Sequence, residues 1–139
     1  MDVTKIPFNQ YIGLKLSIKS EYLLMLDNCS DYRNHLDTVH ASAQFALAEA
    51  TGGFFLLDEF SELTDKIVPV VRKVETNYKK PASSAVFSKA QFIETEKNEV
   101  LKMLNERGRM TLKVAVSLFD ETDVLVMQSV FEWFISKKV

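Results

Sequence analysis

One stretch of the sequence constrains the fold more than any other, an almost unbroken apolar segment with a single carboxylate. Between Ala41 and Leu57 the only polar side chains are Ser42, Gln44, Glu49 and Thr51. A helix that is apolar on nearly all sides belongs inside a protein or a membrane. This segment is short for a bilayer span and contains polar side chains, so we predict a buried helix. An acid in such a helix is costly unless it is paired or has a chemical role, so the role of Glu49 is the central question.

The composition indicates a single folded domain, residues 1–139, that is large enough to bury a hydrophobic core. Its content of 47% hydrophobic and 26% charged residues is typical of a soluble globular protein. The formal net charge of -2 provides no basic excess for a phosphate backbone, which argues against a nucleic-acid partner. The N-terminus shows no signal peptide, and the single cysteine, Cys29, fits a reducing compartment. We therefore expect a cytoplasmic protein with no membrane partner.

The remaining sequence predicts mainly β-strands. Alternating or β-prone residues predict strands at 12–18, 22–26, 66–77, 82–93, 110–119 and 124–135. A short helix is expected at 95–107, with Thr95 as a possible cap and Gly108 at its end. Pro69 removes a ladder donor and should lie at a sheet edge or bulge, while Phe131 and Trp133 are expected in the core. A sheet curled around one helix is the simplest way to bury so apolar a helix.

The start of the apolar helix is a candidate for binding a carbonyl oxygen that gains charge during a reaction. Backbone N–H groups near Ala41 and Ser42 have no helical partners and suit such an oxygen. Glu49 lies eight residues beyond Ala41, which is roughly 12 Å along a helix axis. Within one chain the two cannot act on one small reacting group. Two such helices packed antiparallel in a dimer would bring Glu49 of one chain to the helix start of the other.

The sequence also allows other roles for Glu49, His40 and the remaining candidate residues. Glu49 could be a structural acid in an ion pair, and His40 a capping or packed histidine. Cys29 could be a nucleophile with His35 or His40 as its base, but nothing in the spacing requires it. Asp37 and the two histidines are poor grounds for a metal site, and we predict none.

The segment from Asn34 to Gly53 resembles the active-site segment of hotdog-fold acyl-CoA thioesterases, especially the phenylacetate-pathway type and its uncharacterised relatives. That family has an Asn, then a His-Gly-Gly helix start, then an Asp or Glu on the central helix. Asn34, His40 and Glu49 match these positions at the family's spacing. The stretch around Pro81 and the last two predicted strands are also similar, so the resemblance covers residues 12–135.

The resemblance implies an α+β hotdog fold, with a curled antiparallel sheet around one long central helix, and a homodimer or a dimer of dimers (a homotetramer). It implies that the Ala41 N–H polarises the thioester carbonyl and that Asn34 orients the carbonyl or a water molecule. Glu49 of the partner chain would act as general base or attack directly, and His40 would hold the loop. Apolar surroundings should raise the pKa of Glu49.

The chain departs from the family pattern where Ala41 and Ser42 replace the paired glycines. Ala41 keeps its N–H but adds a methyl group where a thioester would approach, and Ser42 adds a donor or caps the helix. The function expected is that of a hydrolase acting on a thioester of coenzyme A or a related carrier, without a cofactor. The alternatives are a non-catalytic acyl-CoA-binding hotdog protein and a hydratase or dehydratase, whose usual loop the chain lacks.

Basic side chains are candidates for contacts to the phosphates of coenzyme A, although such residues are more often solvated surface groups. They are Lys79, Lys80, Arg107 and Arg109.

Overall fold

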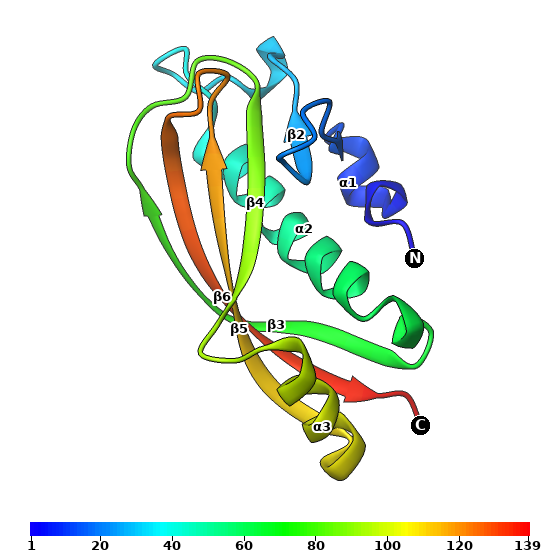
Figure 1. The fold of residues 1–139 in the computed structure, drawn as a ribbon. Helices are drawn as coiled ribbons and strands as arrows, with labels where there is room; N and C mark the ends of the chain where they lie inside the picture. Colours follow the sequence, from blue (N-terminus) through cyan, green and yellow to red (C-terminus); the bar gives the residue numbers. More distant parts are fainter.

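The computed structural model covers residues 1–139 and has the predicted architecture, one sheet curled around one long helix (Figure 1). The helix is α2 (Ala41–Glu59). The other elements are η1 (Val3–Lys5), α1 (Pro7–Tyr11), β1 (Lys15–Leu16), β2 (Leu24–Leu26), η2 (Ser30–Tyr32), η3 (Ser61–Leu63), β3 (Ile67–Tyr78), β4 (Val86–Ile93), α3 (Lys97–Arg107), β5 (Arg109–Phe119) and β6 (Leu125–Lys137). The sheet is antiparallel throughout, with strand order β1-β2-β4-β5-β6-β3.

The β5–β6 hairpin lies in the sheet interior and confirms the predicted alternation. On β5 the residues that point toward the core are fully or almost fully buried, namely Leu112, Val114, Val116 and Leu118. On β6, Phe131 and Trp133 pair with Val114 and Leu112 and are buried as expected. The period of two therefore identified which face of this hairpin meets the helix.

The edge strand β3 explains how the sheet accommodates Pro69. β3 pairs only with β6, and Pro69 lies opposite Ile135 in that ladder. An edge strand has one row of N–H groups outside the ladder, so proline can be tolerated there. The expectation that Pro69 lies at an edge is confirmed. Val68 and Val70 on the same strand are 40% and 46% exposed.

The prediction of a half-buried strand at 12–18 is wrong for most of its length. Pro7 opens the short helix α1, and Gly13 follows it in the left-handed conformation with φ 78°. Only the two residues of β1 are extended, and they pair with β2. Leu14 is buried, but Leu16 and Ile18 are exposed, so the alternation marks no continuous buried face. Alternation alone cannot tell whether the rest of the fold covers a segment.

The predicted cap of α3 is also wrong, although the helix itself is present. The N-cap residue is Glu96, which makes no side-chain capping bond. The Thr95 hydroxyl donates instead to the Glu99 carboxylate, at 3.1 Å. Gly108 ends the helix in the left-handed conformation, with φ 71°, as its position predicted.

A buried hydroxyl network holds α2 on the sheet. The Thr51 hydroxyl oxygen lies 2.6 Å from Ser88 Oγ of β4 and 2.7 Å from the Leu47 carbonyl oxygen. Ser88 Oγ in turn accepts a hydrogen bond from the Leu24 N–H of β2, at 3.1 Å. These contacts set the position of α2 relative to β2 and β4.

One of the two glycines of α2 lets the helix approach the Trp133 ring closely. A Cβ atom added at Gly52 would lie 3.1 Å from Cζ2 and 3.2 Å from Nε1 of Trp133. One added at Gly53 would meet only Cη2, at an ordinary 3.6 Å. The close approach therefore depends on Gly52.

This difference predicts opposite effects for two matched substitutions. Gly53→Ala should stabilise the protein by about 0.5–1 kcal/mol because alanine loses less backbone entropy in a helix. Gly52→Ala has the same helix gain but must displace a buried ring, which typically costs about 1–3 kcal/mol, so net destabilisation is expected. Urea unfolding of both variants would measure this. Equal stabilisation would mean that the ring moves without cost.

Candidate active site

The start of α2 leaves a single backbone donor free. His40 caps the helix, and its Nδ1 accepts a hydrogen bond from the Ser42 N–H at 2.9 Å. The His40 carbonyl accepts from the N–H groups of Ala43 and Gln44, at 3.0 and 3.1 Å. The Ala41 N–H has no partner and belongs to an exposed residue. The helix start can therefore offer one N–H to a carbonyl oxygen.

Asn34 organises the loop that leads into this helix. Its Oδ1 accepts from the N–H groups of Leu36 and Thr38, at 2.9 and 3.1 Å, and its Nδ2 donates to Thr38 Oγ1 at 2.9 Å. An amide nitrogen has two protons, and the second proton of Asn34 Nδ2 has no partner in the chain. The residue is half-buried, so this proton can meet a ligand while the loop stays intact.

An open hollow beside the helix start contains several of the predicted residues. It has a volume of about 300 Å³, and we call it the Asn34 hollow. Its wall includes Asn34, Ala41, Gln44, Tyr78 and Lys80. The Tyr78 hydroxyl donates to the Ala41 carbonyl at 3.2 Å, which joins the end of β3 to the helix start.

His40 and Ser42 line a different hollow, of about 370 Å³, together with Phe8 and Tyr32. The structure therefore separates these two residues from Asn34 and Ala41. Ser42 does not cap the helix, since its N–H is the group that His40 caps.

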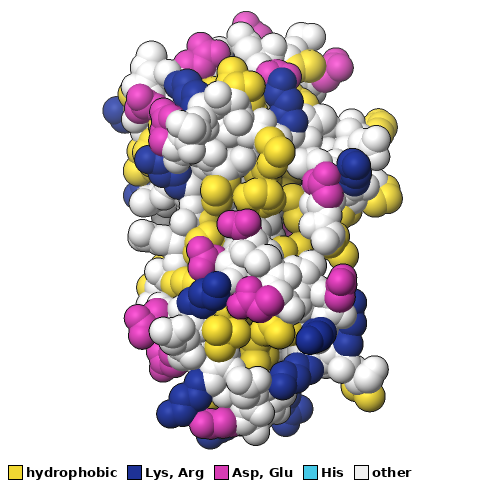
Figure 2. Space-filling view, turned by 45° about the vertical axis from the view of Figure 1, so that its right-hand side comes forward, with side chains coloured by type: hydrophobic (Ala, Val, Ile, Leu, Met, Phe, Trp, Pro, Cys, Tyr) yellow, Lys and Arg dark blue, Asp and Glu magenta, His cyan; other side chains and the backbone are white.

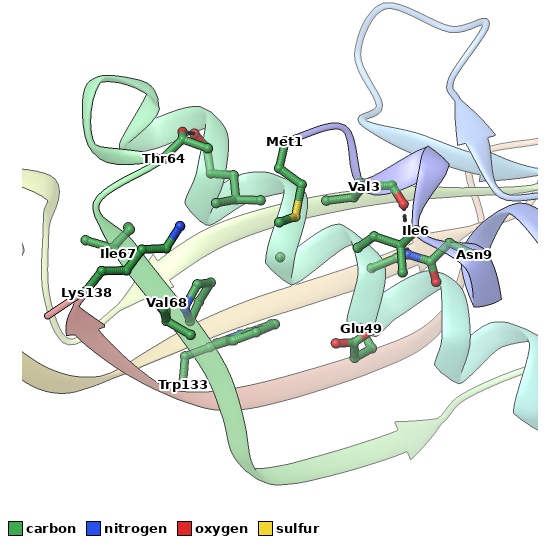
Figure 3. A pocket seen from close by; sticks show the side chains of 14 residues that line it. Met1, Val3, Ile6, Asn9, Glu49, Thr64, Ile67, Val68, Trp133 and Lys138 are labelled. Carbon is green, nitrogen blue, oxygen red and sulfur yellow. Dashed lines mark hydrogen bonds between the residues drawn. The ribbon is translucent and has the colours of Figure 1, made fainter.

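Glu49 faces a third space, a cavity between α2, β3, β6 and the N-terminal segment (Figure 3). This Glu49 cavity has a volume of about 250 Å³. Figure 3 shows Glu49 and Trp133 on one side of it and Met1, Val3 and Ile6 on another. Most of its wall is apolar, as expected for a site that binds the apolar part of a small molecule.

The Glu49 carboxylate is half-buried and makes no hydrogen bond or ion pair. Burial raises its pKa above the ordinary value of 4.5, as the apolar surroundings predicted. Glu49 is therefore not a structural acid held in an ion pair. An unpaired acid that faces a cavity is instead a candidate general base.

The raised pKa gives a testable dependence of stability on pH. Below pH 4.5 Glu49 is protonated in both the folded and unfolded protein, so Glu49→Gln should change stability little. As pH rises through the folded-state pKa, the wild type must bury a charge that glutamine lacks. The variant should then become the more stable protein, and the difference should level off above that pKa. Thermal unfolding from pH 4 to pH 8 would measure it, and a constant difference would contradict the pKa shift.

One chain does not bring all the predicted site residues together. Ala41 and Glu49 line separate spaces on the same helix. At one end of β5, Arg109 pairs with Ser136 of β6. At the other end, Leu118 pairs with Met127 of β6, and Met127 lies opposite Tyr78, which lines the Asn34 hollow. The nine residue steps from 109 to 118 span roughly 30 Å of strand. Arg107 and Arg109 are therefore at the opposite end of the sheet from Ala41 and Lys80.

Two residues that line these spaces have buried, unpaired polar atoms that were not identified from the sequence. Gln44 Oε1 and Trp133 Nε1 have no hydrogen-bond partner, and both side chains are almost fully buried. The alternation of β6 marks Trp133 as a core residue, but no local pattern marks its N–H as unpaired.

The other candidates of the sequence stand apart from these spaces. Cys29 is a half-buried free thiol, and His35 is exposed. No group of three or more His, Cys, Asp or Glu side chains is placed to hold a metal ion. None of the helices has the length and apolar character that crossing a membrane requires.

The curled sheet around one long helix is a hotdog fold, and solved structures confirm this class. A Pseudomonas aeruginosa protein of unknown function, described as a probable thioesterase, has 22% identity and a TM-score of 0.79, over 98% of this chain and 91% of that chain. A Haemophilus influenzae thioesterase has 16% identity and a TM-score of 0.73, over 97% and 86%. A Bacillus halodurans protein solved with CoA has 16% identity and a TM-score of 0.64, over 81% and 69%.

The family within this fold class is given by the sequence. Residues 14–135 match the model of the domain of unknown function DUF4442, so the chain belongs to that family. No curated protein matches the chain.

Proposed function

We propose that this protein hydrolyses the thioester bond of an acyl-CoA or of a related carrier-linked acyl group. The observation that carries the proposal is the unpaired Glu49 carboxylate, with its raised pKa, on the central helix of a hotdog fold. The structural likeness to proteins described as thioesterases supports this reaction class, and the relative solved with CoA supports a CoA-type ligand. The single cysteine is in keeping with a cytoplasmic location.

The proposed site needs two chains, because about 12 Å of helix separates Ala41 from Glu49. In a two-fold dimer with antiparallel α2 helices, Glu49 of one chain would face Ala41 and Asn34 of the other. The edge strand β3 has unpaired backbone groups suited to pairing with a second copy. Phe45 on α2 is 36% exposed, and Figure 2 shows hydrophobic side chains gathered along the middle of one face. An apolar face of this kind is suited to a protein partner.

The reaction follows from the roles proposed for these groups. The Ala41 N–H donates to the thioester carbonyl oxygen, and the positive end of α2 stabilises the charge that develops there. Glu49 takes a proton from water, whose oxygen attacks the carbonyl carbon. The C–S bond then breaks, the thiolate of CoA takes up a proton, and a carboxylic acid is released. The free proton of Asn34 Nδ2 orients the water or the carbonyl.

Basic residues would hold the phosphates of CoA. Lys79 and Lys80 are the best placed of the candidates because both line the Asn34 hollow with Ala41. Arg107 and Arg109 would contribute only if the partner chain or a second dimer brought them near. His40 holds the loop and caps the start of α2, and Ser42 contributes contacts at the neighbouring hollow.

A second candidate function is acyl-CoA binding without hydrolysis. It is favoured by the methyl group of Ala41, which stands where the family pattern has glycine and narrows the approach to the free N–H. The two functions are separated by incubating the purified protein with acyl-CoAs of varied chain length and following thiol release. Turnover supports the hydrolase, whereas tight binding of intact acyl-CoA without thiol release supports the binding protein.

A further inference from the structure

A second polar side chain, Asn9 of α1, lies in the wall of the Glu49 cavity (Figure 3). It is only 5% exposed, and its Nδ2 donates a hydrogen bond to the Val3 carbonyl oxygen at 3.0 Å. A carbonyl oxygen can only accept, so the amide nitrogen must face Val3 and the amide oxygen must face the other way. That oxygen, Asn9 Oδ1, accepts no hydrogen bond within the chain.

Asn9 Oδ1 remains accessible although the residue is almost fully buried. The side-chain polar atoms that are both unpaired and closed off from solvent are Gln44 Oε1 and Trp133 Nε1, and Asn9 Oδ1 is not one of them. Because Asn9 lines the Glu49 cavity, its accessible oxygen opens into that cavity. Figure 3 shows the amide oxygen turned away from the Val3 carbonyl.

Asn9 and Glu49 together present two unpaired acceptors in one part of the cavity. Figure 3 shows Thr64 and Lys138 at the opposite end. Neither an amide oxygen nor an ionised carboxylate has a proton to donate. A small group that contacts both must therefore donate two hydrogen bonds. A hydroxyl group has one proton, whereas water has two and is a reactant in every hydrolysis.

We propose that Asn9 is a catalytic residue whose Oδ1 accepts a hydrogen bond from the water molecule that Glu49 activates. The inference rests on the proposed function and adds a residue to its site. Water held by two acceptors has both of its protons engaged, so a lone pair of its oxygen is free to face the thioester carbonyl carbon. The free proton of Asn34 Nδ2 is then left for the carbonyl oxygen.

The proton balance of the reaction follows from these contacts. Glu49 takes one proton of the water as the new C–O bond forms. The second proton stays on the attacking oxygen and remains hydrogen-bonded to Asn9. The electron pair of the C–S bond leaves with the sulfur, which takes up the proton from Glu49, and the acyl group is released as a carboxylic acid.

Asn9→Leu removes the acceptor with little change in side-chain volume. It should lower kcat for acyl-CoA hydrolysis about 10- to 100-fold, as expected for one lost hydrogen bond to a reacting group. KM should change little, because Asn9 contacts the water and not the acyl-CoA. An unchanged kcat would overturn the inference.

Asp2→Ala is the matched control for the N-terminal segment. Asp2 caps η1 by accepting from the Thr4 N–H at 3.0 Å, and it lies outside the cavity. The variant loosens the segment that carries Asn9 but removes no group from the cavity, so it should keep the wild-type kcat. A loss equal to that of Asn9→Leu would assign the effect to the segment and overturn the inference.

Asn9→Asp separates the acceptor from the bond to Val3. Its carboxylate keeps an oxygen for the water but cannot donate to the Val3 carbonyl, so it loses that bond as Asn9→Leu does. A second carboxylate raises the pKa of Glu49, so kcat is compared at the plateau of each pH profile. Asn9→Asp should retain a kcat at least about fivefold above that of Asn9→Leu. Equal values would mean that the bond to Val3 matters and the acceptor does not.

A crystal structure keeps this inference distinct from the proposed function. A water molecule within about 3.2 Å of both Asn9 Oδ1 and a Glu49 carboxylate oxygen is expected in the wild type and not in Asn9→Leu. Such a water without thiol release from any acyl-CoA would reject the hydrolase and keep the water site. Thiol release by a wild type in which no water bridges the two residues would reject the role of Asn9 and keep the hydrolase.

Discussion

Glu49→Gln is expected to lower kcat for acyl-CoA hydrolysis by about 100- to 10,000-fold, the usual contribution of a positioned general base. Glutamine has nearly the same shape but cannot take a proton from water. Because the wild-type carboxylate makes no hydrogen bond or ion pair, the exchange breaks no contact within the chain. The measurement is thiol release with a saturating acyl-CoA, and substrate affinity should change far less than kcat.

Asp58→Asn is the matched control for this variant. It makes the same exchange of carboxylate for amide on the same helix, at an exposed residue outside the Glu49 cavity. It should keep wild-type activity. Equal losses in both variants, or full activity in Glu49→Gln, would remove Glu49 from the mechanism.

Ala41→Pro is expected to lower kcat by about 100- to 1,000-fold, as the loss of one donor to a developing oxyanion does in other enzymes. Proline lacks the N–H, and it is well tolerated at the first position of a helix because that N–H has no helical partner. His40 has φ -59° and ψ 139°, a conformation compatible with a following proline. The thermal unfolding midpoint should therefore stay near that of the wild type while thiol release falls.

Ala41→Gly separates the N–H from the side chain. It keeps the donor and removes the methyl group, so its kcat/KM should equal or exceed that of the wild type. Full activity of Ala41→Pro would show that the oxyanion is stabilised elsewhere. A large loss in Ala41→Gly would show that the methyl group contacts the substrate rather than crowding it.

Mixing the two inactive variants tests whether the site is shared between chains. In a mixed dimer one site combines the intact Glu49 of one chain with the intact Ala41 of the other, and the second site lacks both. Random reassortment makes about half of the dimers mixed, so activity should return to about a quarter of the wild-type level. No recovery after verified subunit exchange would place both groups of a site in one chain or remove one of them from the mechanism.

Several elements were predictable because their signals are local. The apolar composition of 41–57 required a covered helix, and the period of two on β5 identified its buried residues. Gly108 marked the end of α3, and the missing N–H of Pro69 confined β3 to an edge. In each case the covalent chemistry of a residue excludes the alternatives without reference to distant parts of the chain.

The errors arose where burial depends on distant elements. Leu16 and Ile18 alternate like a half-buried strand, yet no other element covers them. Thr95 had the right chemistry for a cap, but its hydroxyl meets the Glu99 carboxylate instead. A local sequence pattern indicates which structures a segment can form, and packing against the rest of the chain decides which of them it forms.

By itself the sequence determined that one acid lies on an apolar central helix, that this helix starts with free backbone donors, and that a curled sheet covers it. Only the tertiary structure decided that the Ala41 N–H alone remains free, that Asn34 and Lys80 lie beside it, and that the Glu49 carboxylate lines an apolar cavity without a hydrogen bond or ion pair. The reason is physical. A residue's type sets which hydrogen bonds it can make, whereas the position of every neighbouring acceptor and donor sets which ones stay unmade and available to a substrate.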